Sequence, residues 1–253
     1  MTSLIVFLLN ILLTFRFWKK DEKDEKDEKD EIKMLLSLFL IPLIDYTSCI
    51  ISKIFYPEEK IHHNRRWFFI HAVVNGLVSY YNFSDTYLTL TNPVEYPLLP
   101  MSNNAFYATN IVVIAHIYHM IVFYDKLKID EWFHHLTMIP LNGISVYVLG
   151  IKAQSASAFF ICGLPGLIDY SLLWMVKMRW IHKNYEKWIY LYVTTFIRSP
   201  GATMVTYVSL CNINSIKDDW MFGYCMLLMG LNFWNGQYYM MKSCMDHQKY
   251  LNT

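Results

Sequence analysis

The sequence carries almost no net charge. Its 22 lysines and arginines nearly balance its 21 aspartates and glutamates, which gives a formal net charge of +1. Without a large basic field we expect no nucleic-acid partner. Cysteines are few and odd in number, five in all, and most of them fall in apolar stretches. A disulfide framework is therefore not expected either.

Polar helix faces are also scarce. Hydrophobic residues make up 55% of the chain, which is more than a soluble domain usually has. A soluble helical protein of this size would need a polar face on each helix, and several stretches here have none. We therefore expect one membrane-embedded bundle without a second domain.

Seven apolar stretches account for most of the chain. At roughly 20 residues or more, each is long enough to cross about 30 Å of hydrocarbon as a helix. They cover residues 34–56, 67–90, 104–124, 131–150, 155–176, 188–211 and 218–241. The sequence thus predicts an all-α fold, a polytopic transmembrane helical bundle of seven helices over residues 34–243. Residues 244–253 would form a cytoplasmic tail.

The N-terminal region is less clear. Residues 3–18 are apolar except for Arg16, and this length suits either a signal peptide or a short signal-anchor helix. Residues 1–18 could therefore add an eighth helix to the bundle. Residues 19–33 form a run of Asp, Glu and Lys with almost no apolar content. Such a run cannot bury a core, so we expect a solvated charged linker, transiently helical through ion pairs.

Basic residues alternate between the two ends of the predicted helices. The richer loops hold Lys53, Lys60, Arg65 and Arg66, then Lys126 and Lys128, then Lys177, Arg179, Lys183 and Lys187. The intervening loops hold only Lys152 or Lys217, or no basic residue. Loops rich in Lys and Arg face the cytoplasm. We therefore expect the C-terminus inside the cell and the charge run outside.

Ionisable side chains inside membrane helices are costly, so each is a hypothesis for a functional site. His134 and His135 lie about one turn into the fourth predicted helix, and His116 and His119 lie three apart in the preceding helix. Asp130 falls in the turn between the two helices. Two interpretations stay open for the His134–His135 pair: a site facing other helices, or a pair that reaches the interface or caps a backbone.

Three further polar residues fall at a similar depth. Asp169 lies in the fifth helix after the small residues Cys162, Pro165 and Gly166, so another helix can approach closely on this face. Asp169 needs a partner because a buried unpaired carboxylate is expensive. Arg198 in the sixth helix is the obvious candidate, although an Asp–Arg pair can be purely structural. Asn232 in the last helix can bind a ligand or only another helix. With the histidines, these residues predict a cavity that opens toward the cytoplasm.

The histidines also raise the question of a metal ion. The chain has only nine histidines, and four of them, His62, His63, His182 and His247, fall in loops or in the tail. Histidine-box membrane oxidases need many more in tight clusters. We therefore predict no metal and no cofactor, and we expect His116 and His119 to be packed and hydrogen-bonded.

From about residue 60 to residue 243 the chain resembles the TLC-domain family. This family of membrane proteins includes the ceramide synthases, the translocon-associated TRAM proteins and several lipid-regulating members. The matching pieces, in order, are Trp67 to His71, Phe123-Tyr124-Asp125 with Asp130 and His134-His135, Asp169-Tyr170-Ser171 with Arg179-Trp180, Arg198, and Leu231-Asn232 with Trp234. The resemblance implies a lipid-related role in the endoplasmic reticulum or a related endomembrane rather than in the plasma membrane.

The chain departs from the ceramide-synthase branch at one place. That branch has a His-Asp pair in the helix after its His-His motif, whereas residues 163–169 contain Asp169 and no histidine. The homeobox-like region of some animal synthases is also absent. The chain is therefore not a good match to this branch, and the resemblance does not imply acyl transfer to a sphingoid amine.

Three functions remain in competition. The first is a protein of lipid handling or lipid homeostasis that binds a lipid or acyl group in the cavity, with His116, His119, Asp130, Arg198 and Asn232 as binding residues. The second is an acyltransferase-like enzyme in which His134 or His135 is the general base, Asp169 or Asp130 orients the imidazole, and acyl-CoA is the co-substrate. The third is a seven-helix receptor or transporter, for which no signature or clear repeat is visible. Membrane lipids are the expected partners, and the oligomeric state is left open, a homo-oligomer included.

Overall fold

The structure is a computed structural model that describes residues 25–139, 143 and 145–251, with side chains described from Leu36 onward except at 130, 133, 137, 138, 250 and 251. The predicted signal or anchor segment, residues 3–18, lies outside the described residues. The all-α fold class is confirmed for the described chain, which contains helices and no strand. A single antiparallel bridge between Pro100 and Ile151 joins two loops.

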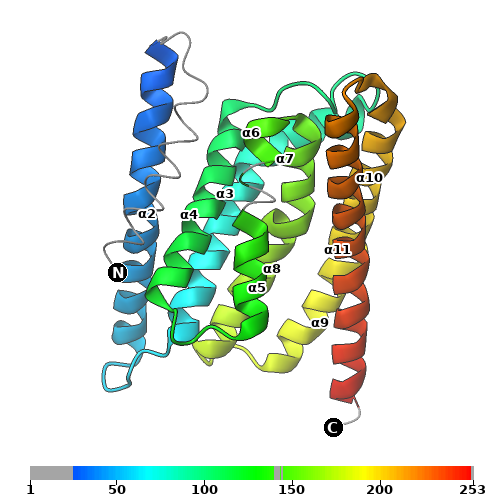
Figure 1. Cartoon of the computed structure of the whole chain (residues 1–253). Coiled ribbons are helices and arrows are strands. Elements are labelled where there is room, and N and C mark those ends of the chain that lie inside the picture. The colour runs from blue at the N-terminus through cyan, green and yellow to red at the C-terminus, as the bar shows by residue number, and fades with distance from the viewer. Residues whose placement is uncertain (1–24, 140–142, 144, 252–253) are drawn as a thin grey trace.

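The helices follow one another with short connections. Their bounds are α2 Glu25–Phe55, α3 His63–Thr91, α4 Asn103–Val122, α5 Ile129–Met138, α6 Ser145–Val148, α7 Lys152–Ala158, η2 Phe159–Gly163, α8 Leu164–Lys177, α9 Lys183–Val193, η3 Thr194–Arg198, α10 Ser199–Asn212, η4 Ile213–Ser215 and α11 Asp219–Leu251. The main helices run side by side, with α2 at one edge of the bundle and the α10–α11 pair at the other (Figure 1).

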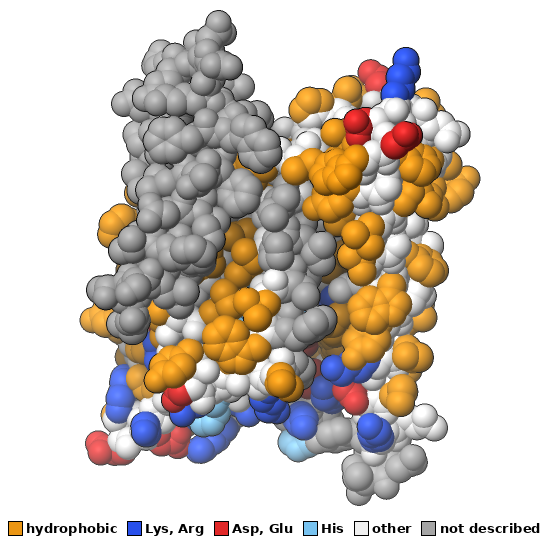
Figure 2. All heavy atoms as spheres, viewed as in Figure 1, with side chains coloured by type: hydrophobic (Ala, Val, Ile, Leu, Met, Phe, Trp, Pro, Cys, Tyr) orange, Lys and Arg blue, Asp and Glu red, His pale blue; other side chains and the backbone are white. Residues whose placement is uncertain are grey.

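Three helical segments in the described residues are long and apolar enough to cross a membrane. They are Leu36–Phe55, Asn103–Val122 and Lys152–Lys177, the last formed by α7, η2 and α8 together. Many large hydrophobic side chains on the outside of the bundle are exposed, Phe39, Tyr80 and Phe196 among them. Figure 2 shows such side chains along the length of the helices, as expected for a surface that faces lipid.

The polar content of α3 reflects its place in the bundle. This helix packs against α2, α4, α7 and α8. Its Asn75, Asn82 and Asp85 are all buried. Polar side chains on such a helix face protein instead of lipid, which is where a membrane bundle tolerates them.

Two π-helical turns interrupt the long segments, each just before a proline. In η2, the Leu164 N–H bonds the Phe159 carbonyl, and Pro165 follows. In η3, the Ser199 N–H bonds the Thr194 carbonyl, and Pro200 follows. Proline lacks the N–H that would continue the α-helical pattern, so the wider turn satisfies the neighbouring carbonyl groups.

Small residues let helices approach closely at two points. A Cβ atom at Gly166 would meet the Asn75 side chain of α3, and one at Gly201 would meet the ring of Phe160. The sequence predicted a close approach on the small-sided face before Asp169, and the Gly166–Asn75 contact confirms it. Membrane helices use small residues in this way because van der Waals packing drives their association.

Two helices extend beyond their predicted boundaries. Helix α2 begins at Glu25, so residues 25–33 of the predicted linker belong to a helix that continues into the apolar stretch. Ion pairs three and four residues apart allow such a charged run to be helical. Helix α11 extends through most of the predicted tail to Leu251. Of the predicted helix 131–150, the structure describes α5 and α6, and residues 140–142 and 144 between them lie outside the described residues.

Candidate functional site

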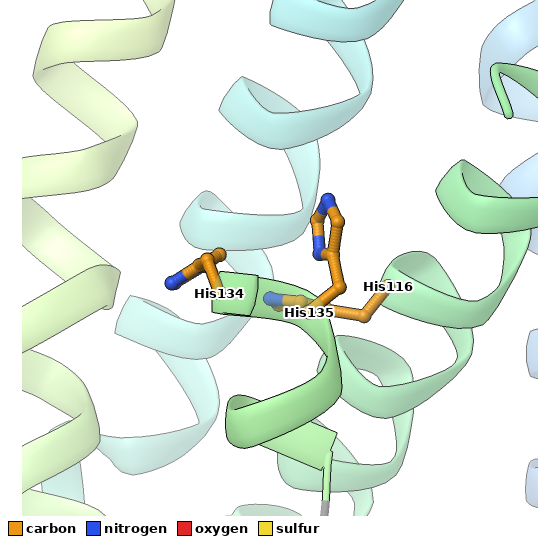
Figure 3. A group of neighbouring side chains, drawn as sticks. All are labelled: His116, His134 and His135. Carbon is orange, nitrogen blue, oxygen red and sulfur yellow. The ribbon is translucent and has the colours of Figure 1, made fainter. Parts of the chain in front are cut away.

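Histidines from α4 and α5 form a compact cluster. The ring centroids of His116 and His135 lie 5.1 Å apart, those of His116 and His134 5.6 Å apart, and those of His119 and His135 4.8 Å apart. His116 reaches from α4 toward His135, while His134 points away from them on the other side of α5 (Figure 3). The structure therefore brings together all four histidines that the sequence singled out.

The cluster follows from the local chain path. His116 and His119 are three residues apart and share one face of α4. The short segment 123–128 then reverses the chain, and the Lys128 N–H donates to Glu131 Oε2 at 2.8 Å, which fixes the start of α5. Because α5 lies back along α4, it brings His134 and His135 close to the α4 histidines. Asp130 lies in the first turn of α5, and its side chain is outside the described residues.

A fifth histidine, His71 of α3, joins the cluster. Its ring centroid lies 6.4 Å from that of His116, 6.1 Å from that of His119 and 4.5 Å from that of Tyr170. Trp67, one turn earlier, packs against both His71 and His119. Sequence reasoning used His71 only for the family resemblance, although an ionisable residue inside an apolar stretch was already a signal.

The ring nitrogens differ in their hydrogen bonds. His116 Nδ1 lies 2.8 Å from the Val112 carbonyl oxygen and donates to it, so its Nε2 is left as an acceptor. The Nδ1 atoms of His71, His119 and His135 are buried and have no hydrogen-bond partner among the described residues. We expected packed and hydrogen-bonded rings for His116 and His119. Both rings are packed, but among the described residues a side-chain hydrogen bond is found for His116 and not for His119.

Accessibility separates the two adjacent histidines of α5. His135 is only 2% exposed, whereas His134 is an exposed residue. His134 also lies within Coulombic range of Arg198. Of the two, His134 is thus the one that an incoming molecule can reach.

Arg198 lies at the end of η3, across the bundle from α4. Its guanidinium donates to Asn235 Oδ1 at 2.8 Å and lies 3.8 Å from the ring centroid of Tyr239, both on α11. Asp169 lies within Coulombic range of Arg198, but the hydrogen-bond partner of Arg198 among the described residues is Asn235. The expected direct Asp169–Arg198 pair is therefore replaced by an Arg–Asn contact and a cation–π contact.

Asn232 does not belong with the histidines. Its amide donates to the Ala202 carbonyl and to Thr206 Oγ1, both at 2.8 Å, and so joins α11 to α10. It lines a small pocket with Leu98 and Ile151, near the loop at the end opposite the α4–α5 turn. Among the described residues, these contacts connect Asn232 to α10 and to the small pocket.

A second pocket is an apolar groove on the outside of the bundle. It has a volume of about 270 Å³ and lies between α3 and α8, lined by Phe69, Val73, Leu167 and Trp174, with Trp180 at its end. Residues 69, 73 and 76 face away from His71 on α3, since at ~100° per residue they lie about half a turn around the helix from it. The groove and the histidine cluster therefore lie on opposite sides of the α3–α8 contact.

Two buried charge networks escaped the sequence reasoning. Asp45 of α2 accepts two hydrogen bonds from Arg66 of α3 and one, at 2.6 Å, from the hydroxyl of Tyr118 of α4. At the other end, Asp85 accepts from Lys152 at 3.2 Å and Ser155 at 3.1 Å. Asp45 and Asp85 lie inside apolar stretches, and this position is the signal that could have found them.

A clasp of charged groups closes the basic end of the bundle. Arg65 donates to Glu59 at 2.8 Å and to the Lys177 carbonyl at 3.0 Å, and Arg179 binds Glu59 at 3.0 Å. The hydrogen bond from Arg65 lowers the pKa of the Glu59 carboxyl below its usual value. The α2–α3 loop is thereby joined to the end of α8.

Comparison with protein-family models, with curated proteins and with solved structures gives no match.

Proposed function

We propose that the chain is a polytopic membrane protein of the TLC type with seven transmembrane helices over residues 34–243. The described helical segments fall close to the seven predicted stretches, and three of them qualify as spans by length and composition. The family resemblance rests on the sequence pieces already named. It favours the endoplasmic reticulum or a related endomembrane.

The basic residues support an orientation with the α4–α5 turn in the cytoplasm. Lys and Arg gather at the lower end of the molecule in Figure 2. The segments 56–62, 123–128 and 178–182 connect helices at this end and carry or adjoin most of the basic residues in the loops. The histidine cluster then lies in the cytoplasmic half of the bundle.

We further propose that the protein handles lipid, and that the polar group of a lipid or an acyl carbonyl binds between His134 and Arg198. The observation that carries this proposal is the accessible His134 between a buried histidine cluster and the guanidinium of Arg198. Ionisable groups persist inside a membrane bundle chiefly where a pathway or ligand uses them. Arg198 supplies donors suited to a phosphate or carbonyl oxygen.

Native mass spectrometry of the purified protein, with a panel of phospholipids, sphingolipids and fatty acids, tests this proposal. We expect one lipid class to remain bound, and we expect Arg198→Lys to weaken that binding about tenfold because the planar fork is lost. Lys217→Ala, an exposed change at the opposite end, serves as the control. Equal retention of all lipids, or no effect of Arg198→Lys, would contradict the proposal.

Acyl transfer is the second candidate, and the exposure of His134 favours it. His134 would accept the proton of a lipid hydroxyl or amine as its oxygen or nitrogen bonds to the acyl carbon of acyl-CoA. The carbon–sulfur bond would break, and the thiolate would take the proton from the imidazolium. His135, being buried, would support His134 and not touch the substrate.

A thioester-cleavage assay separates the two candidates. If the protein is an enzyme, wild type should release free thiol from acyl-CoA in the presence of an acceptor lipid. His134→Ala should then lower the rate by about 10²- to 10⁴-fold, the usual contribution of a general base. Lipid binding without thiol release across many acceptors would leave lipid handling as the function.

A further inference from the structure

We propose that His116, His134 and His135 bind a zinc ion. One ligand atom from each of these side chains can be chosen so that all lie within 4.8 Å of one another. Figure 3 shows that the three side chains come from two adjacent helices, α4 and α5, at one level of the bundle. Two helices that share a cluster in this way provide the kind of scaffold on which bundle proteins build metal sites.

The distances require only a modest closure around an ion. Nitrogen ligands of tetrahedral zinc at 2.0–2.1 Å from the metal are about 3.4 Å apart, so the nitrogens must approach by at most about 1.5 Å. His134 is exposed, and rotation of its side chain can supply this movement. His116 and His135 already have ring centroids 5.1 Å apart.

The hydrogen bonds suit metal ligands. A metal-binding histidine usually donates its other ring N–H to a carbonyl or carboxylate, which fixes the ring and the tautomer. His116 does this through Nδ1 and the Val112 carbonyl at 2.8 Å, which presents Nε2 to the cluster. His135 Nδ1 is buried without a partner among the described residues, as is the Nδ1 of its neighbour His119. A metal ion gives His135 a partner that no described side chain supplies.

The donor set selects the kind of metal. Three neutral imidazoles without thiolate or carboxylate favour zinc or another late divalent transition metal over Mg²⁺ or Ca²⁺, which prefer oxygen. Three protein ligands leave a fourth position for water or for a carbonyl or phosphate oxygen of a lipid. Among nearby charges, Glu131 favours a cation beside His134, while Arg198 opposes it.

The zinc proposal does not rest on the lipid-handling proposal. Protein is purified in detergent through an affinity tag without histidines, stripped with EDTA, exposed to ZnCl₂ alone and desalted, and its zinc is measured by mass spectrometry. We expect about one zinc per chain. His116→Gln and His135→Gln should each weaken zinc binding by more than the 10- to 100-fold that loss of an outer hydrogen-bond partner typically causes.

His182→Asn is the matched control. His182 lies outside the cluster and caps α9 by accepting from the Asn184 N–H, a role that asparagine can keep. Its zinc content should equal that of wild type. Stripped wild type that takes up no zinc, or cluster variants that bind zinc as tightly as wild type, would overturn the proposal.

A spectroscopic measurement on wild type tests the zinc site even if the cluster variants fail to fold. Wild type loaded with Cu²⁺ in place of Zn²⁺ should give an electron paramagnetic resonance spectrum with coupling to three imidazole nitrogens. Coupling to fewer than two nitrogens would overturn the assignment. Because neither measurement contains lipid, failure of zinc binding leaves the lipid-binding test on stripped protein unaffected.

Discussion

The contact between Asp45, Arg66 and Tyr118 offers a direct test of how the bundle is held together. The side chain of Asp45 is 4% exposed and that of Arg66 is 29% exposed, and the three residues come from α2, α3 and α4. We expect Asp45→Ala to leave a guanidinium and a phenol without their partner. Removing one member of a fully buried ion pair costs about 3–5 kcal/mol.

The expected magnitude is smaller because Arg66 can turn partly toward solvent. We estimate about 2–4 kcal/mol for Asp45→Ala, of which about 1 kcal/mol is the lost bond to the Tyr118 hydroxyl. In a double-mutant cycle with Arg66→Ala, the coupling energy should reach about 2 kcal/mol. The exposed pair of Lys126 and Asp125 is the control, and Lys126→Ala should change stability by less than about 0.5 kcal/mol.

The assay is reversible unfolding in mixed micelles, in which SDS is titrated against a non-ionic detergent and helicity is followed by circular dichroism. Each variant gives a free energy of unfolding at a common micelle composition. A coupling energy below about 0.5 kcal/mol between Asp45 and Arg66 would refute the reasoning. It would mean that the pair contributes no more than an exposed one.

Two further outcomes are expected from the same assay and from hydrogen exchange. Gly201→Ala should destabilise the bundle by about 1–3 kcal/mol because its Cβ would meet Phe160, whereas Gly223→Ala, with nothing within 4 Å, should be neutral or stabilising; equal effects would contradict this packing. The lowered pKa of Glu59 means that its carboxylate stabilises the α2–α3 clasp above the unfolded pKa of about 4.3, and that this contribution is lost as pH falls through the folded value. The protection factors of the amides in residues 56–62, which correct for the slower intrinsic exchange at low pH, should therefore fall on acidification in wild type and be low at neutral and at acidic pH in Glu59→Gln; parallel behaviour of the two proteins would count against the clasp.

Much of the architecture could be predicted because long apolar runs allow few alternatives to membrane helices. The approximate positions of the helices, the close approach at Gly166 and the similar depth of the α4 and α5 histidines all followed from spacing along the sequence. Helices α2 and α11 both continue into charged sequence, and the predicted helices ended too early at these places. Helix boundaries depend on ion pairs along the helix as well as on hydropathy.

The unpredicted parts of the site depend on tertiary geometry. His71 joins the cluster only because α3 packs at the centre of the bundle, and no spacing along the sequence fixes that position. Arg198 contacts Asn235 instead of Asp169 because η3 packs more closely against α11 than against α8, which carries Asp169. The Asp45–Arg66 pair joins residues 21 apart across two helices, so only the three-dimensional structure reveals it.

Cryo-electron microscopy of the chain in lipid nanodiscs, with a bound antibody fragment to provide size, tests the central claim most directly. We predict that the side chains of His71, His116, His119 and His135 face one another within the bundle, at the end that carries the basic loops, with His134 turned toward Arg198. Density that places these side chains against acyl chains, or α5 away from α4, would contradict it.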